Sequence, residues 1–361
     1  METITKNIGI FILNHNGIEW LKQTIPNILQ HSSYVDIIII DNHSTDQSVN
    51  YIKTNFTNIE VKINTENYGF SKGYNQVLLP ETRYKYFIVL NNDVKVTHNW
   101  IAPLIATMER ENAGIVQPKI INANKKNRFD YAGGAGGFID IMGIPFCRGR
   151  ILNNLELDNG QYNDNKNIFW ASGCCFMIES KLFQRLDGFD EDLFMHQEEI
   201  DLCWRAQKIN KTVKYCSQSK IYHYGGGTLK MHDPKKHYYN HRNNLLILIK
   251  NLPLSSLIAI LPIRLMLDYC IISFYLTLGL LYIVFTLPLY LDKRYQPEKK
   301  YGVQKIKISF WILLAHIHLL LLLKSFIKKR SPIKPKYIYP RSIIFDFFIQ
   351  ERKTFSELKK F

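Results

Sequence analysis

Residues 35–46 read VDIIIIDNHSTD and predict the structural unit from which the first part of the chain is built. The run Val35–Ile40 is mostly β-branched and apolar, which predicts a buried strand that ends on Asp41. Ser44, Thr45 and Asp46 then offer N-caps for a helix. A buried strand, a polar turn and a helix in that order are typical of an α/β fold.

The same order recurs on both sides of this stretch. Apolar positions spaced for a helix run from Trp20 to Leu29, with a bend expected at Pro26. Another helix is expected from Asn67–Asn75. Strands are predicted at Ile8–Leu13, Ile59–Ile63 and Tyr86–Leu90. The alternation predicts a Rossmann-like, mostly parallel central sheet with helices on both faces.

Polar residues follow three of these strands directly: Asn14–Gly17, Asp41–Asp46 and Asn91–Asp93. In open α/β sheets ligands bind beyond the carboxyl ends of the strands. The G-x-G-x-x-G fingerprint and the Walker A motif are both missing, which disfavours an oxidoreductase. We therefore expect a nucleotide site without a glycine cradle, in which an acidic residue and a metal hold the diphosphate.

Asp93 is the metal candidate, because hard divalent cations prefer carboxylate oxygen and keep substrate phosphates among their ligands. The alternative is that Asp93 is simply a turn residue. Asp41 suits a hydrogen bond to a base or a ribose, or else a helix-capping turn.

Residues 188–205, GFDEDLFMHQEEIDLCWR, concentrate acidic side chains. Ile200, Cys203 and Trp204 form one apolar helical face, and Glu198 and Asp201 fall on the opposite face. Glu199 lies on the flank between the two faces. The stretch is either a solvated, N-terminally charged helix or the support of a general base.

Taken together, these residues resemble the family 2 glycosyltransferases of the GT-A fold, and most closely the bacterial rhamnosyltransferase-like branch that acts on cell-surface polysaccharides. The match covers about residues 6 to 245. Its markers are Asn14–Gly17, Asp41–Asp46, Asn67–Asn75, Asn91–Asp93 as a degenerate D-x-D, Trp170–Gly173, Gly188–Arg205 and His223–Thr228.

The resemblance implies an inverting, metal-dependent glycosyltransferase of polysaccharide and cell-envelope biosynthesis. The donor would be a nucleotide-diphosphate sugar, dTDP-rhamnose or a UDP-sugar. The acceptor would be a hydroxyl of a polyprenyl-linked or polysaccharide glycan. Mg²⁺ or Mn²⁺ would be held by Asp93 and His223.

The resemblance also assigns roles to further residues. Glu199 would be the catalytic base, with Glu198 and Asp201 in reserve. Arg242 would close over the diphosphate as part of a lid, or bind lipid phosphates. The nucleotide-binding residues would be Asn14, Asn16, Asp41, Asn67, Lys72, Asn75 and Asn92, and the acceptor side would hold Trp170, Gly173, Asp190 and Asp192.

One departure concerns the base. The family usually has Glu-Asp where this chain has Glu198-Glu199, so Glu199 reaches one methylene further than the usual Asp. The change retains catalysis, shifts the acceptor or signals lost activity. The competing function is therefore a catalytically silent GT-A domain that serves as a membrane-bound glycan-binding or scaffolding subunit.

Residues 121–168 show weak periodicity and predict a long binding loop or lid that frames the acceptor. Trp170 either stacks on a sugar ring or anchors a strand predicted at Ile168–Ile178. His223, near the end of an alternating run, is either a ligand or a structural histidine.

The positive charge of the chain is concentrated in its last third. The chain carries 46 basic and 31 acidic residues, and residues 231–361 hold 22 of the basic ones but only 7 of the acidic ones. This shift predicts a boundary near residue 230, with a catalytic domain at 1–230, whose core runs to about 245, and a basic helical region at 231–361. A basic tail is typical of proteins that bind nucleic acid or an anionic membrane, and the apolar stretches in the same region favour the membrane.

Two apolar stretches predict how this region meets a bilayer. Tyr269–Leu291 is long enough to cross one, whereas Ile308–Leu323 is short for a span. Basic residues between them oppose a crossing that places them outside. We expect monotopic or re-entrant attachment at the cytoplasmic face of the inner membrane, with Pro262 and Pro288 as bends. The six cysteines show no C-x-x-C pair, which fits a reduced compartment.

Overall fold

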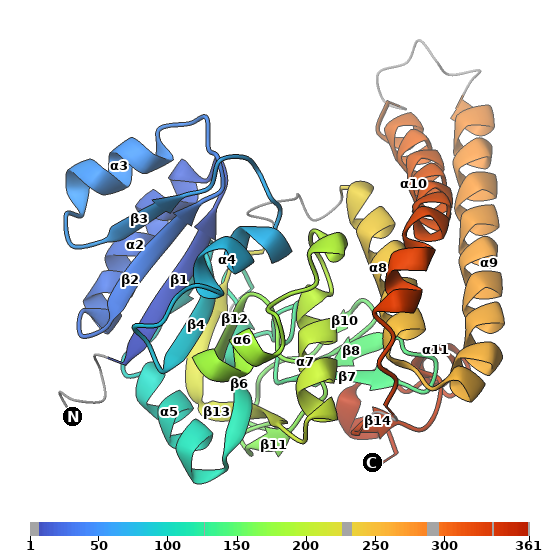
Figure 1. Ribbon diagram of the computed structural model, residues 1–361. Coiled ribbons are helices and arrows are strands. Elements are labelled where there is room, and N and C mark those ends of the chain that lie inside the picture. The colour runs from blue at the N-terminus through green and yellow to red at the C-terminus, as the bar shows by residue number, and fades with distance from the viewer. Residues whose placement is uncertain (1–6, 126, 226–232, 287–295, 334–335, 360–361) are drawn as a thin grey trace. The chain divides into compact units, whose positions relative to one another are not determined.

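The structure is a computed structural model that describes residues 7–125, 127–225, 233–286, 296–333 and 336–359 (Figure 1). The chain divides into two compact units. The first combines Met1–Thr228 with Pro335–Phe361, and the second is Leu229–Lys334. The C-terminal tail therefore belongs with the first unit, which corrects the prediction of one continuous region over 231–361.

A central sheet organises the first unit, with the strand order β11-β13-β6-β12-β4-β1-β2-β3 and with β5 paired to β13. Its strands are β1 (Ile8–Asn14), β2 (Asp36–Asp41), β3 (Glu60–Ile63), β4 (Tyr86–Asn91), β5 (Val94–Val96), β6 (Ala113–Asn122), β11 (Lys166–Asn167), β12 (Cys175–Glu179) and β13 (Thr212–His223).

The predicted parallel sheet is confirmed for the first four long strands. Ile10 of β1 pairs with Ile37 of β2 and with Ile88 of β4, both in parallel register. Beyond β4 the sheet becomes mixed, because β12 runs antiparallel to both β4 and β6. The carboxyl ends of β1, β2 and β4 therefore meet at one edge.

Helices cover both faces of this sheet, as predicted. Alternate residues of a strand face opposite sides, so Ile10 packs with α2 and α5, while Phe11 meets Phe87, which in turn contacts Phe183 of α6. The helices of this unit are α2 (Ile18–Ser32), α3 (Ser48–Asn55), α4 (Ser71–Leu78), α5 (Ile101–Arg110), α6 (Ser180–Arg185), α7 (Glu198–Lys208) and α11 (Ile343–Phe348).

The predicted cap of α3 is shared between two helices. Gln47 is the N-cap residue of α3, in place of Ser44 or Thr45. The Asp46 carboxylate accepts hydrogen bonds from the backbone amides of Ser48 in α3 and Ile18 in α2. One side chain thus fixes the starts of both helices.

Residues 121–168 form a second sheet, so the prediction of a long, weakly structured loop is wrong. The order is β10-β9-β8-β7-β14, formed by β7 (Gly137–Asp140), β8 (Pro145–Cys147), β9 (Arg150–Ile151), β10 (Asn154–Leu155) and β14 (Ile338–Tyr339). The strand predicted at Ile168–Ile178 is confirmed only over residues 175–178, which belong to β12, because residues 168–174 separate β11 from β12.

The tail is attached to this small sheet by several contacts. β14 pairs in parallel with β7. The buried Asp140 carboxylate accepts from the backbone amide of Ile343 at 2.9 Å, and the Asn154 side chain donates to the carbonyl of Lys353 at 2.7 Å. These contacts use long-range pairings that a local pattern does not reveal.

The second unit consists of α8 (Lys235–Asn251), α9 (Leu254–Thr286) and α10 (Gln296–Lys328). Both α9 and α10 are long and apolar enough to cross a membrane, which corrects the expectation that Ile308–Leu323 is too short. The two helices form an antiparallel hairpin with close backbone contact, since a Cβ on Gly279 would lie 2.8 Å from the carbonyl oxygen of Gly302. Pro262 lies inside α9, whereas Pro288 falls outside the described residues.

Asp140→Ala is predicted to loosen the tail. The substitution leaves the amides of Ile343, Met142 and Ile144 without this acceptor, and for the buried amide of Ile343 the loss costs about 1–3 kcal/mol. Limited trypsin digestion should cleave the tail after Arg352 or Lys353 at least several-fold faster than in wild type. Glu66→Ala, an exposed change in the same unit, serves as the control. Equal cleavage rates of all three proteins would contradict the anchoring role.

Candidate active site

Three polar side chains meet where β1, β2 and β4 end. The Asn14 amide donates to the Asp41 carboxylate at 3.3 Å, and the Asn92 amide donates to the Asn14 carbonyl oxygen at 2.9 Å. All three side chains are buried. The parallel register of the strands brings together residues that lie 27 and 78 positions apart.

The turn after β1 covers this group closely. A Cβ at Gly17 would lie 2.4 Å from side-chain atoms of both Asn14 and Asn92, so only glycine fits there. Asn16 has a positive φ of 50°, and its side-chain oxygen accepts from the backbone amides of Thr45 and Asp46. Asn16 therefore orders the turn that follows β2.

Asn42 is a buried residue of this edge that the sequence did not single out. Its side-chain amide donates to Asn67 at 3.0 Å and to the carbonyl of Gly69 at 2.9 Å, and its oxygen accepts from Asn64. Asn67 is thus held in place by Asn42. The only sequence signal for Asn42 is its position directly after Asp41 at the end of a strand.

Lys72 and Asn75, predicted to bind nucleotide, differ in their surroundings. The Lys72 ammonium lies 4.0 Å from the centre of the Tyr68 ring and is half-buried. Asn75 is buried, and its side chain donates to the carbonyl of Phe189 and accepts from the amide of the same residue. Both ends of the Asn75 amide thus connect α4 to the 188–191 segment, which corrects its assignment to the nucleotide.

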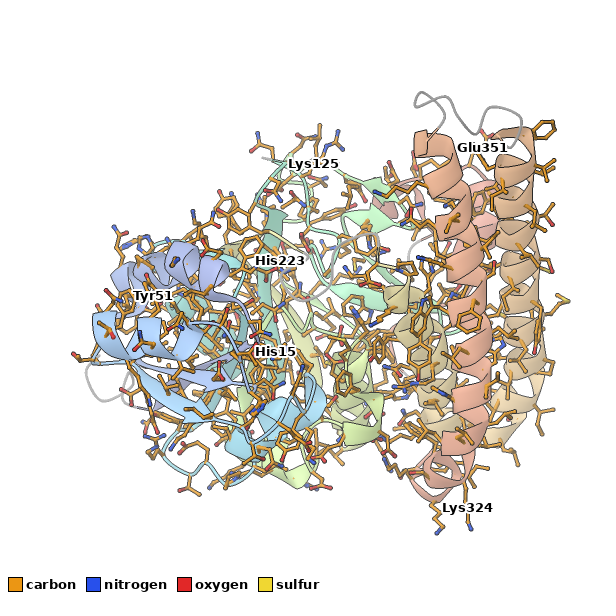
Figure 2. All side chains as sticks on the ribbon, turned by 90° about the horizontal axis from the view of Figure 1, so that it is seen from above. His15, Tyr51, Lys125, His223, Lys324 and Glu351 are labelled. Carbon is orange, nitrogen blue, oxygen red and sulfur yellow. The ribbon has the colours of Figure 1, made fainter. Side chains whose placement is uncertain are left out.

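Next to this edge, a histidine lies between two buried carboxylates. His223 ends β13, and the pairing of β13 with β5 places it beside Asp93. Its Nε2 is 3.2 Å from Asp93 Oδ1, and its Nδ1 is 3.0 Å from Asp130 Oδ2 (Figure 2 labels His223). Burial acts to lower the pKa of His223, but the charges of Asp93 and Asp130 outweigh it and raise the pKa well above its usual value.

The pair Asp93 and His223 fits a divalent cation in its donor chemistry. Asp93 Oδ1 and His223 Nε2 lie 3.2 Å apart, and Asp130 holds the other ring nitrogen, as outer partners of metal-bound histidines do. A cation bound here would displace the proton from Nε2. Among the described residues no group of three or more His, Cys, Asp or Glu side chains is arranged to hold a metal. A cation here would need further ligands from a substrate, which phosphates supply. Asp130 was missed because it lies in the region interpreted as a loop.

The acidic helix α7 is buried, so the interpretation as a solvated helix is wrong. Glu198 is 3% exposed and Glu199 is half-buried. Burial raises the pKa of Glu199 to about 7, and burial together with the charge of Glu199 raises the pKa of Glu198 well above its usual range. Two neighbouring carboxylates that resist ionisation are typical of an acid–base site.

Gly173 connects the acid pair to the end of β4. A Cβ on Gly173 would lie 3.8 Å from carboxylate atoms of both Glu198 and Glu199. The neighbouring Cys174 carbonyl accepts from the backbone amide of Asn91, the last residue of β4, at 2.9 Å. The residues before Asp93 and the acid pair thus adjoin the same short segment.

The turn before α7 is conformationally strained. Phe194, His196 and Gln197 all have positive φ values, which cost free energy for residues with a side chain. The Phe194 carbonyl accepts from the backbone amides of Phe70 and Ser71 at the start of α4, at 2.7 and 3.1 Å. The start of α4 thus holds the turn in the conformation that presents Glu198 and Glu199.

Two predicted site residues have structural roles. Asp201 is fully buried and forms an ion pair with Arg205 at 2.7 Å, and Arg205 also donates to the carbonyl of Gly188. This structural role corrects the prediction that Asp201 is a reserve base. Trp170 is 4% exposed, and its ring packs on Gly137 while its N–H donates to Phe138, so it cannot stack on a sugar.

The remaining predicted residues have partners of their own. Asp190 caps a short 3₁₀ helix, Glu191–Leu193, by accepting from the amide of Asp192. Arg242 lies in the second unit, where it donates to Asn243 and to the Tyr238 hydroxyl at 2.9 Å each. Their acceptor-side and diphosphate roles stay predictions.

Sequence comparisons identify the relatives of this chain. Residues 9–187 match the family model described as Glycosyl transferase family 2. A low-salt glycan biosynthesis hexosyltransferase of Haloferax volcanii is 24% identical over 60% of this chain and 66% of its own length, just under two thirds. A rhamnosyltransferase of Escherichia coli is 22% identical over 60% of this chain and 83% of its own. The N-acetylglucosaminyl-diphospho-decaprenol L-rhamnosyltransferase of Mycobacterium tuberculosis is 22% identical over 60% and 74%.

Solved structures share the fold. GalNAc-T7 with UDP, GalNAc and Mn²⁺ aligns with a TM-score of 0.53 and 16% identity over 88% of this chain and 57% of that one. The mannosyltransferase of Pyrobaculum calidifontis with GDP-Man and Mn²⁺ aligns with a TM-score of 0.50 and 11% identity over 87% of each chain. Residues 9–187 therefore form a domain of glycosyltransferase family 2, and the chain has the GT-A fold.

Proposed function

We propose that the protein transfers a sugar, with inversion, from a nucleotide-diphosphate sugar to a hydroxyl of a lipid-linked or cell-surface glycan. The observation that carries this proposal is the acid pair Glu198–Glu199 beside Gly173, next to the end of β4, which Asp93 and its partner His223 follow. Two of the relatives are named rhamnosyltransferases, which supports a donor such as dTDP-rhamnose, and the similar structure of GalNAc-T7 holds UDP, which supports a UDP-sugar. The name of one relative includes a decaprenol-linked acceptor.

The donor would bind along the edge formed by β1, β2 and β4. Asp41 and the asparagines around it offer amide and carboxylate groups for the base and the ribose, and Asn42 keeps that wall rigid. Asp93 and His223 would hold Mg²⁺ or Mn²⁺. Such an ion neutralises the charge of a leaving diphosphate.

Glu199 is the proposed general base, which removes the proton of the acceptor hydroxyl as it attacks. Its pKa of about 7 lies near the operating range of a base at neutral pH. Glu198 has the more strongly buried carboxylate, and burial together with the charge of Glu199 raises its pKa well above the usual range, so a second negative charge beside Glu199 is disfavoured. In this arrangement the longer Glu199 side chain retains the role usually filled by Asp.

The metal role predicts that Asp93→Asn abolishes metal-dependent nucleotide binding. The substitution removes the single hard anionic ligand beside His223. Thermal unfolding of the full chain should show stabilisation of wild type by UDP or dTDP with Mn²⁺ and none for the variant. Asp187→Asn, an exposed change at a position with positive φ that asparagine tolerates, serves as the control. An unchanged Mn²⁺ response of Asp93→Asn would leave Asp93 as a turn residue.

The base role predicts that Glu199→Gln lowers turnover by about 10² or more while nucleotide binding persists. Because the pKa of Glu199 is about 7, kcat/KM of wild type should rise with pH through that value and then level off. The measurement is a pH series with a panel of nucleotide sugars. Wild-type nucleotide binding without any turnover would favour the alternative of a silent glycan-binding subunit.

Glu198→Gln is the matched control for Glu199→Gln. It is expected to keep most of its turnover and to change the stability of the protein instead. A folded-state pKa raised above the unfolded value means that the folded chain holds its proton more tightly, so stability falls as pH rises from about 4.5 towards that pKa. The variant should therefore gain stability over wild type at pH 8 but not at pH 4, and keep most of its turnover. Urea unfolding at both pH values measures this. A stability difference that does not change with pH would contradict the burial of an ionisable carboxyl.

We also propose attachment to the cytoplasmic face of the membrane. The chain leaves the first unit before the hairpin α9–α10 and returns to that unit after it, where β14 pairs with β7, so the hairpin crosses a bilayer twice or not at all. Two crossings would place the basic residues that precede α10 or lie in its first turns on the far side, against the positive-inside tendency: Lys293, Arg294, Lys299 and Lys300. Monotopic or re-entrant attachment keeps these residues near the anionic leaflet. Each basic residue there favours membrane binding by about 1 kcal/mol.

A single cysteine at Gln296 tests this attachment. With the native cysteines replaced, a membrane-impermeant thiol reagent applied to intact cells should leave position 296 unlabelled and should label it after the cells are opened. A second cysteine at Glu66, in the first unit, is the control for the cytoplasmic side. Labelling of position 296 in intact cells would show that the hairpin spans.

A further inference from the structure

The first unit contains a cavity of about 730 Å³ whose residues take no part in the candidate active site. One wall comes from the segment between β10 and β11 and from β8 and its turn, with Arg148, Tyr162 and Lys166. The opposite wall is the C-terminal tail, with Phe355 and Lys359. The tail is fixed there, because the amide of Phe355 donates to the Glu156 carboxylate at 2.9 Å.

The cavity lies far from the proposed metal ligands. Lys166 pairs with Tyr215 near the start of β13, whereas His223 is the last residue of the same strand. β13 bulges between Cys216 and Lys220, so the paired strand β6 advances five positions over this stretch, from Gln117 to Asn122, which corresponds to roughly 16 Å. A ligand in this cavity therefore does not overlap with a nucleotide at the other end of β13.

The charged groups that line the cavity are mostly positive. Arg148, Lys166 and Lys359 face a single carboxylate, that of Asp164, which forms an ion pair with Arg148. Arg148 is 3% exposed and lies against the rings of Tyr162 and Tyr215, at 4.6 and 5.4 Å. Two nitrogens of its guanidinium, Nε and Nη1, have no hydrogen-bond partner among the described residues.

The two cations of the first wall act on each other. Burial and the charge of Arg148 both lower the pKa of Lys166. Holding two like charges at one wall costs free energy that an anion between them would offset, as charge-assisted hydrogen bonds do. The fold therefore maintains an electrostatic preference for a negatively charged group at this point.

Uncharged groups around these cations favour a hydroxyl-rich ligand. The Asn163 amide and the Ser356 hydroxyl line the cavity and offer hydrogen bonds, while Tyr162 and Phe355 supply ring surface. The volume lies in the range of sites for small molecules. We propose that this cavity binds an anionic saccharide, a sugar unit that bears a phosphate or a carboxylate, with the anion beside Arg148 and Lys166.

The test is direct binding to the full chain in detergent, by calorimetry with EDTA present so that no divalent ion supports the donor site. The probes are glucose 1-phosphate, glucose and inorganic phosphate. Glucose 1-phosphate should bind at least about tenfold more tightly than either of the others. Equal affinity for glucose would overturn the anion contact, and equal affinity for inorganic phosphate would overturn the saccharide contact.

Variants of both walls locate the site. Lys166→Gln and Lys359→Gln should each weaken glucose 1-phosphate binding, the first by about tenfold, since a lost charge-assisted hydrogen bond has that effect. Lys359 is exposed and its substitution does not endanger folding. Lys181→Gln, an exposed change on α6, should bind as wild type, and so should Asp93→Asn, which separates this site from the donor site. Unchanged binding by both Lys166→Gln and Lys359→Gln, or its loss in Asp93→Asn, would overturn the proposal.

Discussion

The candidate site depends on the hydrogen bonds that the amides of Phe70 and Ser71 donate to the carbonyl of Phe194. They join the start of α4, beside the nucleotide edge, to the strained turn that precedes the acid pair. Gly69 makes this approach possible, because a Cβ there would lie 2.6 Å from the Phe194 ring. Without these two hydrogen bonds, nothing named here would offset the free-energy cost of the positive φ angles before α7. Glu198 and Glu199 would then lose their fixed position.

A second joint supports the first from the other side of α4. Asn75 binds both the amide and the carbonyl of Phe189, and the rings of Phe70, Tyr74 and Phe189 pack edge to face around it. Arg205 of α7 is held by an ion pair with Asp201 of the same helix and donates to the carbonyl of Gly188 at the far side of this segment. The residues that carry proposed chemistry are thus surrounded by residues that only position them, which is how a fold keeps buried carboxylates at a defined place.

Burial is what gives these groups their proposed chemistry, and it acts differently on the two halves of the site. At the acid pair, desolvation is not offset by an opposite charge, so both carboxyl pKa values rise. At His223, two carboxylates outweigh desolvation, and the imidazole pKa rises as well. A carboxyl group whose pKa lies near neutral pH and two carboxylates beside a histidine are the complementary parts that the proposed sugar transfer would use.

The sequence by itself determined the parallel strands, the helices on both faces and the edge where Asn14, Asp41 and Asn92 meet. These follow from apolar periodicity, and periodicity is a local property of the chain. It also located the acidic helix and the apolar C-terminal helices. Only the tertiary structure decided that Asn75, Asp201 and Trp170 are scaffold residues, that Asp130 lies behind His223, and that the tail returns to β7. The physical reason is that each of these depends on a partner distant in sequence, and the burial that such a partner creates is not visible in local composition.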